Sequence, residues 1–264
     1  MSETPALELR GVTAGYGNTT VLRDVSIHVA AKSVVALLGP NGAGKTTTLR
    51  TASGLLPLAA GQVLLHGHDV THMAAYARAK QALCMIPEGR GIFPSLTVLE
   101  NFRLQAPRGR GSRDSVVENA VDLFPVLRKH LRRTAGTLSG GQQQMVALAR
   151  TYVSGASVIL LDEVSMGLSP AMVDQVFDAL RRLAARGTAL LLVEQYATRA
   201  LGIADEVVLM NKGSVSLRAP ASEMNEDRIS EHYLGAGVIP AQGTGARPPL
   251  DPMKNQGQGD DVEN

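Results

Sequence analysis

The sequence predicts an α/β fold with a mixed sheet, in which antiparallel strands at the N-terminus precede a parallel core sheet flanked by helices. Two observations lead to this prediction. Short, continuous apolar runs occur at residues 34–38, 158–161 and 189–193, and such runs are typical of strands buried on both faces. Helical patterns lie between them, at 46–53 and 171–186, and strands that alternate with helices form parallel sheets.

The N-terminal segment has a different pattern. Residues 6–12 and 24–29 alternate between apolar and polar side chains, which is typical of half-buried strands. Residues 15–18 contain two glycines and an asparagine, so they are expected to form the turn between these strands. We therefore expect the chain to begin with antiparallel strands.

A helical subdomain is expected between about residues 87 and 152. Apolar residues recur there at helical spacing, over 98–104, 115–127 and 143–152. A basic, glycine-bearing loop at 107–113 separates the first two of these helices.

The length and composition predict one domain followed by a tail. A chain of 264 residues with 44% hydrophobic content can bury one substantial core. Beyond residue 235 the chain is rich in Gly, Pro, Gln and Asp and has few groups to bury. We therefore expect a domain over 1–235 that includes the helical insert, and a disordered tail over 236–264.

Charge and hydropathy exclude several classes of protein. The 26 basic and 24 acidic residues are interspersed and give a net charge of +2, so no nucleic-acid partner is expected. The apolar runs fall far short of the roughly 20 residues that a helix needs to span a bilayer. The N-terminus also lacks the charged and apolar regions of a secretory signal. Any link to a membrane is therefore expected to come through a partner.

A glycine-rich loop after the first core strand fits the P-loop pattern. It consists of Gly39, Pro40, Asn41, Gly42, Ala43, Gly44, Lys45 and Thr46. The glycines permit backbone conformations that point N–H groups at phosphate oxygens, and the helix that follows presents its positive end to the same anion. Lys45 would contact the β- and γ-phosphates, Thr46 would ligate Mg²⁺, and Thr47 belongs to the same site. A chance match is the alternative, but the flanking strand and helix argue against it.

A pair of carboxylates follows the second core strand. Asp162 and Glu163 stand where a parallel sheet presents groups to a ligand, which is the Walker B pattern. Asp162 would hold Mg²⁺ through water or through Thr46. Glu163 would act as general base toward the attacking water. Two solvated carboxylates after a core strand are the alternative interpretation.

A second anion-binding pattern is the pentapeptide that starts at Leu138. Ser139, Gly140, Gly141 and Gln142 precede a predicted helix, so a serine, two glycines and a helix N-terminus lie together. An ordinary helix cap is the alternative. This LSGGQ sequence and its order between the P-loop and Walker B resemble the ABC transporter ATPase family, over residues 7 to about 234.

The resemblance implies a P-loop nucleoside triphosphatase of ABC type. In that family the serine-glycine element of one subunit closes over the γ-phosphate on the partner's P-loop, so Ser139 and Gly141 would complete the partner's site. Tyr16 falls where the family has an aromatic residue that stacks on adenine, which favours ATP, although packing is the alternative for a turn tyrosine.

Three positions depart from the usual family pattern. Glu88 stands where a glutamine is usual, and its carboxylate can still reach Mg²⁺ or water. Ser169 replaces a usual aspartate, which places cross-subunit coupling in doubt. Gln195 replaces a usual histidine, so a neutral amide would contact the γ-phosphate and hydrolysis is expected to be slow. These departures are similar to the second ATPase of branched-chain amino-acid importers and their urea or amide relatives.

The resemblance implies an ATPase that powers import of a small solute, with ATP and Mg²⁺ as cofactors and Lys45, Glu163 and Gln195 as its catalytic residues. The implied partners are a second ABC ATPase chain, two transmembrane permease subunits and, indirectly, an extracytoplasmic solute-binding protein. A heterodimer is expected, with a homodimer as the alternative. The implied location is peripheral, on the cytoplasmic face of the membrane.

Three other classes of protein share some or all of these motifs. A urea or amide importer has the same motifs. A soluble ABC ATPase that acts on DNA or ribosomes would usually carry a coiled-coil insertion or two fused cassettes, together with a basic surface stripe. A nucleotide kinase or small GTPase shares the P-loop but does not account for Leu138 to Gln142.

Overall fold

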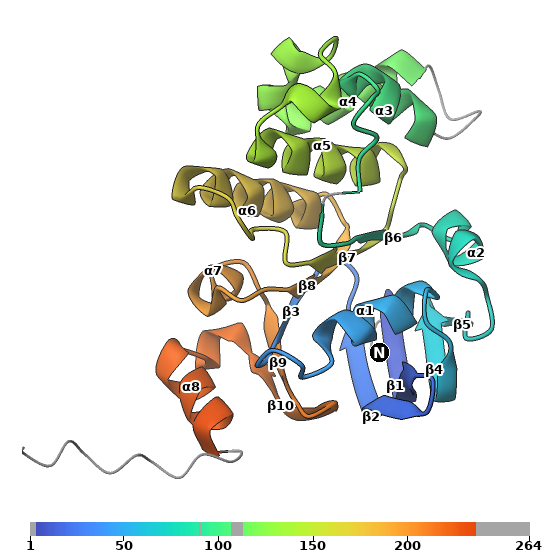
Figure 1. Cartoon of the computed structure of the whole chain (residues 1–264), viewed down its shortest axis with the longest axis vertical. Helices are drawn as coiled ribbons and strands as arrows, with labels where there is room; N and C mark the ends of the chain where they lie inside the picture. Colours follow the sequence, from blue (N-terminus) through green and yellow to red (C-terminus); the bar gives the residue numbers. More distant parts are fainter. Residues whose placement is uncertain (1–3, 90, 107–112, 236–264) are drawn as a thin grey trace, which may run out of the picture.

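The computed structural model describes residues 4–89, 91–106 and 113–235, and its strands form two sheets (Figure 1). The smaller sheet is antiparallel and has the order β2-β1-β4-β5, with strands β1 (Leu7–Tyr16), β2 (Thr19–Val29), β4 (Leu58–Leu65) and β5 (His68–Asp69). The larger sheet has the order β10-β9-β3-β8-β7-β6, with strands β3 (Val34–Leu38), β6 (Leu83–Ile86), β7 (Val158–Asp162), β8 (Ala189–Val193), β9 (Glu206–Asn211) and β10 (Ser214–Pro220). Only its β10–β9 pair is antiparallel. The predicted mixed sheet is confirmed.

Helices cover the larger sheet and extend away from it. The α-helices are α1 (Lys45–Ser53), α2 (Ala75–Lys80), α3 (Val98–Gln105), α4 (Arg113–Leu123), α5 (Gly140–Val153), α6 (Pro170–Ala185), α7 (Ala197–Leu201) and α8 (Glu226–Gly235), with 3₁₀ turns η1 (Pro125–His130), η2 (Ala135–Thr137) and η3 (Ala221–Glu223). In Figure 1, α3, α4 and α5 gather at the end of the molecule away from the smaller sheet, and they fall within the predicted helical insert. The limits of a helical subdomain stay a prediction.

The core lies on both faces of the parallel strands. All five residues of β3 are buried, and they alternate between two hydrophobic clusters. Val34, Ala36 and Leu38 pack in the cluster that contains the apolar sides of α5 and α6. Val35 and Leu37 pack in the cluster that contains α1 and the inner face of the smaller sheet. This double burial explains why β3, β7 and β8 are visible in the sequence as continuous apolar runs.

One predicted helix is too long. The pattern over 115–127 predicted a single helix, whereas α4 ends at Leu123 and the 3₁₀ turn η1 begins at Pro125. Proline has no backbone N–H to donate and its ring clashes with the preceding turn, so the helix cannot continue through it. The predicted loop at 107–113 lies outside the described residues except for Arg113, which begins α4, and the predicted tail at 236–264 lies outside them entirely.

The first turn is shorter than predicted. Strand β1 extends through Tyr16 and pairs it with Thr19, so residues 17 and 18 make the turn in place of the expected 15–18. Gly15 lies inside the strand pair, where an added Cβ would be 1.9 Å from the carbonyl oxygen of Thr19. The glycine pattern therefore marked a close approach of two strands as well as the turn itself.

A buried arginine holds the C-terminal end of α1. Arg78 of α2 is 1% exposed, and its guanidinium donates hydrogen bonds to the carbonyl oxygens of Thr51 at 2.9 Å and Ala52 at 2.8 Å. It also donates to the carbonyl oxygens of Thr71 at 2.8 Å and Met73 at 3.1 Å. The last carbonyl groups of a helix lack partners within it, and the helix dipole makes this end negative. Arg78 therefore fixes α1, whose other end adjoins the glycine-rich loop.

We predict that Arg78→Met lowers the free energy of unfolding by about 2–4 kcal/mol, because it leaves several buried carbonyl oxygens without a donor. Urea denaturation of the full chain would measure the change. Arg181→Met is the matched control, since Arg181 forms an exposed ion pair with Asp178 that is worth at most about 1 kcal/mol. Equal losses in the two variants would contradict the assignment.

Candidate active site

The glycine-rich loop leads from β3 into α1 in a conformation that depends on glycine. Gly42 and Gly44 have φ angles of 80° and 103°, in the left-handed region that other residues rarely adopt. A Cβ on Gly39 would lie 2.4 Å from the carbonyl oxygen of Met210, so β9 passes too close for any side chain. Gly44 is the N-cap of α1, and no side chain caps this end. The first N–H groups of α1 are therefore free to bind an anion.

The loop opens into a cleft of about 480 Å³. The cleft brings together most of the residues predicted from the P-loop with two predicted catalytic residues, namely Asn41, Gly42, Gly44, Lys45, Thr46, Thr47, Glu163 and Gln195. The predicted residues Gly39 and Pro40 contribute their carbonyl oxygens, which accept hydrogen bonds from Lys45. Ala43 is buried beneath the loop. Val21 of β2 also lines the cleft and was missed, because an apolar residue in a strand gives no chemical signal in the sequence.

Lys45 spans the loop. Its Nζ donates to the carbonyl oxygens of Gly39 at 2.7 Å and Pro40 at 3.1 Å, and the residue is only 6% exposed. Burial lowers the pKa of this ammonium group, while the carboxylates of Glu163 and Asp162 act in the opposite direction. The ammonium is therefore positioned next to the anion-binding N–H groups, with little competing water.

Thr46 and Asp162 meet at the base of the cleft. The Thr46 hydroxyl donates to the Asp162 carboxylate at 3.1 Å, so the ends of β7 and of the loop are joined directly. Burial raises the pKa of Asp162; its hydrogen bond from Thr46 lowers it, and the charges of Glu163 and Glu88 raise it further. A hydroxyl and a desolvated carboxylate are oxygen ligands that suit Mg²⁺.

The metal-binding capacity of the site is incomplete without a substrate. Among the described residues, no three His, Cys, Asp or Glu side chains are grouped closely enough to hold a metal ion. Mg²⁺ commonly binds through one or two protein oxygens together with substrate phosphates and water. The Thr46–Asp162 pair fits that mode, and Glu88 lies exposed after β6, close enough for its charge to affect Asp162.

Glu163 and Gln195 face each other across the cleft. The amide Nε2 of Gln195 lies 3.2 Å and 3.3 Å from the two carboxylate oxygens of Glu163 and donates to them. Glu163 has a φ of 47°, which is an unusual conformation for a residue with a side chain. The predicted general base and the predicted switch residue are thus in contact with each other.

Tyr16 is not among the residues that line the cleft. It ends β1 and is 44% exposed, and Nη1 of Arg50 in α1 donates to its hydroxyl oxygen at 3.3 Å. The predicted stacking on adenine stays a prediction.

The pentapeptide with Ser139 forms a helix cap. Ser139 is the N-cap of α5, where its hydroxyl accepts the N–H of Gln142 at 3.4 Å and the Gln142 side chain accepts the N–H of Ser139 at 3.2 Å. Gly140 begins the helix, and a Cβ on Gly141 would lie 2.3 Å from the Met172 side chain. None of these residues lines the cleft of the same chain. Ser139 is exposed, so it can reach another molecule.

The P-loop, the hydroxyl–carboxylate pair and the parallel sheet together define a P-loop nucleoside triphosphatase. Residues 22–166 match the family model described as "ABC transporter". The branched-chain amino acid transport ATP-binding protein BraG of Pseudomonas aeruginosa is 33% identical over 226 residues, covering 85% of this chain and 97% of the relative. A probable branched-chain amino acid transport ATP-binding protein, LivF of Archaeoglobus fulgidus, is 37% identical over 230 residues, covering 86% and 97%.

The chain belongs to the ABC transporter family of ATP-binding subunits, and it is an ATPase. A solved structure described as an ATP binding subunit of an ABC transporter has the same fold, with a TM-score of 0.76 at 23% identity over 86% of this chain and 99% of that one. Relatives named for iron(III) import and lipopolysaccharide export match at 33% and 32% identity. Sequence similarity therefore identifies the family but does not identify the transported solute.

We predict that Asp162→Asn stabilises the nucleotide-free chain, because it removes a desolvated charge that lies close to Glu163 and Glu88. Each 1 kcal/mol gained raises the melting temperature by about 2–4 °C in a domain of this size. The same variant should lose most of the additional stabilisation that Mg²⁺ provides in the presence of ATP.

Calorimetry with and without Mg²⁺ and nucleotide would check both effects. Asp205→Asn is a control at another carboxylate, which accepts the N–H of Val34 away from the cleft. A lower melting temperature for nucleotide-free Asp162→Asn would contradict the prediction.

Proposed function

We propose that the chain binds ATP and Mg²⁺ in the cleft at the glycine-rich loop and powers import of a small solute, branched-chain amino acids in the first place, through membrane permeases. The observation that carries this proposal is the meeting in one cleft of Lys45, the Thr46–Asp162 pair and the Glu163–Gln195 pair. Two relatives that match nearly their whole length are named for branched-chain amino-acid transport. A urea or amide importer is the second candidate.

In this proposal each group has a separate task. The N–H groups of the loop and of the α1 N-terminus bind the phosphates, and Lys45 turns its ammonium toward the β- and γ-phosphate oxygens. Thr46 and Asp162 hold Mg²⁺, which neutralises phosphate charge when bound. Glu163 orients the attacking water and takes its proton. Gln195 holds the Glu163 carboxylate in place through its amide and contacts the γ-phosphate as a neutral donor.

The other half of the site comes from a second ATPase chain. Within one subunit Ser139 is exposed, and the Ser139–Gln142 cap does not line the cleft. A head-to-tail pair would place the serine-glycine element of each subunit over the phosphates held by the other. We propose a heterodimer, with a homodimer as the alternative, in which Ser139 and Gly141 complete the partner's site.

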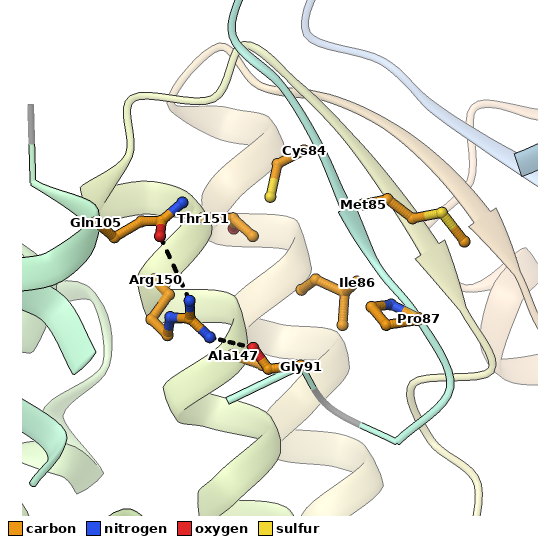
Figure 2. Close-up of a pocket in the computed structure, with 9 residues that line it drawn as sticks. All are labelled: Cys84, Met85, Ile86, Pro87, Gly91, Gln105, Ala147, Arg150 and Thr151. Carbon is orange, nitrogen blue, oxygen red and sulfur yellow. Dashed lines mark hydrogen bonds between the residues drawn. The ribbon is translucent and has the colours of Figure 1, made fainter. Parts of the chain in front are cut away.

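The surface that transmits the motion to the permeases is proposed to be the one around Glu88 to Phe93, together with the helical insert. Arg150 of α5 donates to the carbonyl oxygen of Gly91, lies 3.4 Å from the amide oxygen of Gln105 at the end of α3, and stacks its guanidinium 4.7 Å from the Phe93 ring centre. Figure 2 shows Arg150 between Gln105 and Gly91, at one side of a cavity of about 190 Å³ that Ile86 and Pro87 border from β6 and the segment after it. Phe93 is 46% exposed. Movement of α5 would therefore pull directly on this segment.

The proposed location is peripheral, at the cytoplasmic face of the membrane. In the part of the chain that the structure describes, no helix has both the length and the hydropathy to cross a bilayer. The permease contact described above, and an indirect link to an extracytoplasmic solute-binding protein, would hold the chain there.

We predict that Lys45→Ala weakens ATP binding at least about a hundredfold and reduces hydrolysis to background, because a charge-assisted contact to two phosphates is lost. Isothermal titration and a phosphate-release assay would measure the two effects. Lys80→Ala is the control, since Lys80 is an exposed lysine that lies over the Tyr76 ring. Retention of wild-type turnover in Lys45→Ala would refute the site.

We also predict that the tagged chain, purified from membranes in mild detergent, carries a second ABC ATPase and two permease polypeptides. Reconstitution of that complex with its solute-binding protein should give ATP-dependent uptake of labelled leucine, isoleucine or valine. Uptake of urea or a small amide in preference to these amino acids would support the second candidate. Recovery of the chain with ribosomes or DNA, and without permeases, would overturn the transport proposal.

A further inference from the structure

A buried carboxylate lies directly behind the candidate active site. Glu194 is the first residue after β8 and is 2% exposed. In the described part of the chain, no lysine, arginine or histidine forms an ion pair with it. Burial raises the pKa of Glu194, and hydrogen bonds from Ser165 act against that rise. A carboxylate in such a place is costly unless its hydrogen bonds have a specific purpose.

Both carboxylate oxygens of Glu194 bind one residue. The backbone N–H of Ser165 donates to Oε1 at 3.1 Å, and the Ser165 hydroxyl donates to Oε2 at 2.6 Å. Ser165 is itself 1% exposed and lies two residues after Glu163. Glu194 therefore holds the turn that follows β7 from the protein interior.

Three consecutive residues at the end of β8 hold this turn. The carbonyl oxygen of Val193 accepts the N–H of Glu163 at 3.0 Å, Glu194 binds Ser165, and Gln195 binds the Glu163 carboxylate from the cleft side. The backbone of the turn is closed by the N–H of Met166, which donates to the carbonyl oxygen of Glu163 at 3.2 Å. Glu163 is thus held in position by Val193 at the end of β8, by Glu194 through Ser165 in the interior, and by Gln195 on the cleft side.

This support is needed because Glu163 is strained. Its φ of 47° lies in the left-handed region, which is unfavourable for a residue with a side chain. Such a conformation persists only where surrounding bonds over-determine it. Two of the three supports are charge-assisted, since the Glu194 carboxylate accepts from Ser165 and the Glu163 carboxylate accepts from Gln195, and charge-assisted hydrogen bonds are roughly twice as strong as neutral ones. Of these two, the support from Glu194 is the buried one.

We propose that Glu194 is a positioning residue for ATP hydrolysis, which holds Ser165 and thereby keeps Glu163 in the left-handed conformation that directs its carboxylate into the cleft. Among the described residues, no hydrogen bond or ion pair joins Glu194 to the glycine-rich loop, so we expect its effect on the catalytic step and not on nucleotide binding. The inference rests on the proposed role of Glu163 as general base.

The first test separates kcat from nucleotide affinity. Glu194→Gln retains the shape of the side chain but replaces the charged acceptor with a neutral amide. Its carbonyl oxygen can accept the Ser165 N–H, whereas its NH₂ group can only donate to the Ser165 hydroxyl oxygen, so the charge-assisted bonds from Ser165 are lost. In the purified transporter complex we expect kcat to fall about tenfold, the effect of losing this charge-assisted hydrogen bonding. The ATP dissociation constant should stay within about twofold. Glu206→Gln is the control for general destabilisation: it breaks the half-buried ion pair between Glu206 of β9 and Arg218 of β10 and should leave kcat unchanged.

A second variant tests whether the effect passes through Ser165. Ser165→Ala removes the hydroxyl and keeps the backbone N–H bond, so kcat should fall about threefold. The double variant should be no slower than Glu194→Gln alone, because both changes break the same link. Multiplicative losses, equal losses in the Glu206→Gln control, or a parallel loss of ATP affinity would each overturn the proposal. If Glu194→Gln does not fold, Ser165→Ala carries the same test.

Hydrogen exchange in the nucleotide-free full chain gives a readout that does not depend on ATP. Glu194→Gln should speed exchange of the amides of Ser165 and Met166 about tenfold, with the amides of β7 unchanged. Unchanged exchange at the turn would overturn the positioning role even if the chain hydrolyses ATP normally. A wild-type chain that binds no ATP would instead refute the proposed function, while leaving the exchange result intact.

Discussion

The active site depends on the hydrogen-bonded register of three parallel strands. Strand β8 lies between β3 and β7, and Val193 pairs with Leu37 on one side and Asp162 on the other. The carboxyl ends of the three strands therefore finish at one level, and the segments that leave them converge: the glycine-rich loop after β3, Glu163 after β7 and Gln195 after β8. Ligands commonly bind at this edge of open α/β sheets. A shift of one residue in any of these strands would separate the residues proposed to bind phosphate from those proposed to act on water.

Ionisable groups whose burial is unfavourable also lie together at this edge of the sheet. Lys45, Asp162 and Glu194 are all less than 10% exposed, and burial is the largest influence on the pKa of each. Such groups weaken the nucleotide-free fold, and in the proposed function bound nucleotide and Mg²⁺ would compensate for the first two. The cost of Glu194 is offset within the chain by Ser165. Stability and function therefore oppose each other most strongly within a few residues of the cleft.

The sequence predicted those parts of the structure whose physical cause is local. Strands β3, β7 and β8 were predicted because full burial leaves only apolar residues in them, and the loop of residues 39–46 was predicted because phosphate binding needs glycine. Strands β4, β6 and β10 were not predicted, since their short or half-exposed segments have no clear period. Strand β9 was missed although residues 207–210 form a buried apolar run like those of β3, β7 and β8. The contact of Glu194 with Ser165 spans 29 residues, so nothing near either residue marks it. Val21 was missed for a similar reason, whereas the end of α4 at Leu123 has a local signal, the helix-breaking Pro125, that the apolar pattern over 115–127 obscured.

The Ser139 cap at the start of α5 is compatible with both interpretations of this segment, an ordinary helix cap and an anion-binding element. A serine hydroxyl carries one proton and two lone pairs, and the cap uses only a lone pair, which accepts the N–H of Gln142. The proton is left free to rotate toward an incoming oxygen anion, while the oxygen atom that carries it is already fixed in position. The Ser139 side chain therefore loses its conformational entropy when the helix folds. Little further entropy would be lost when the proposed dimer closes. In the proposed dimer, the hydroxyl that stabilises one subunit would also serve, at little further cost, as a preorganised donor for the other.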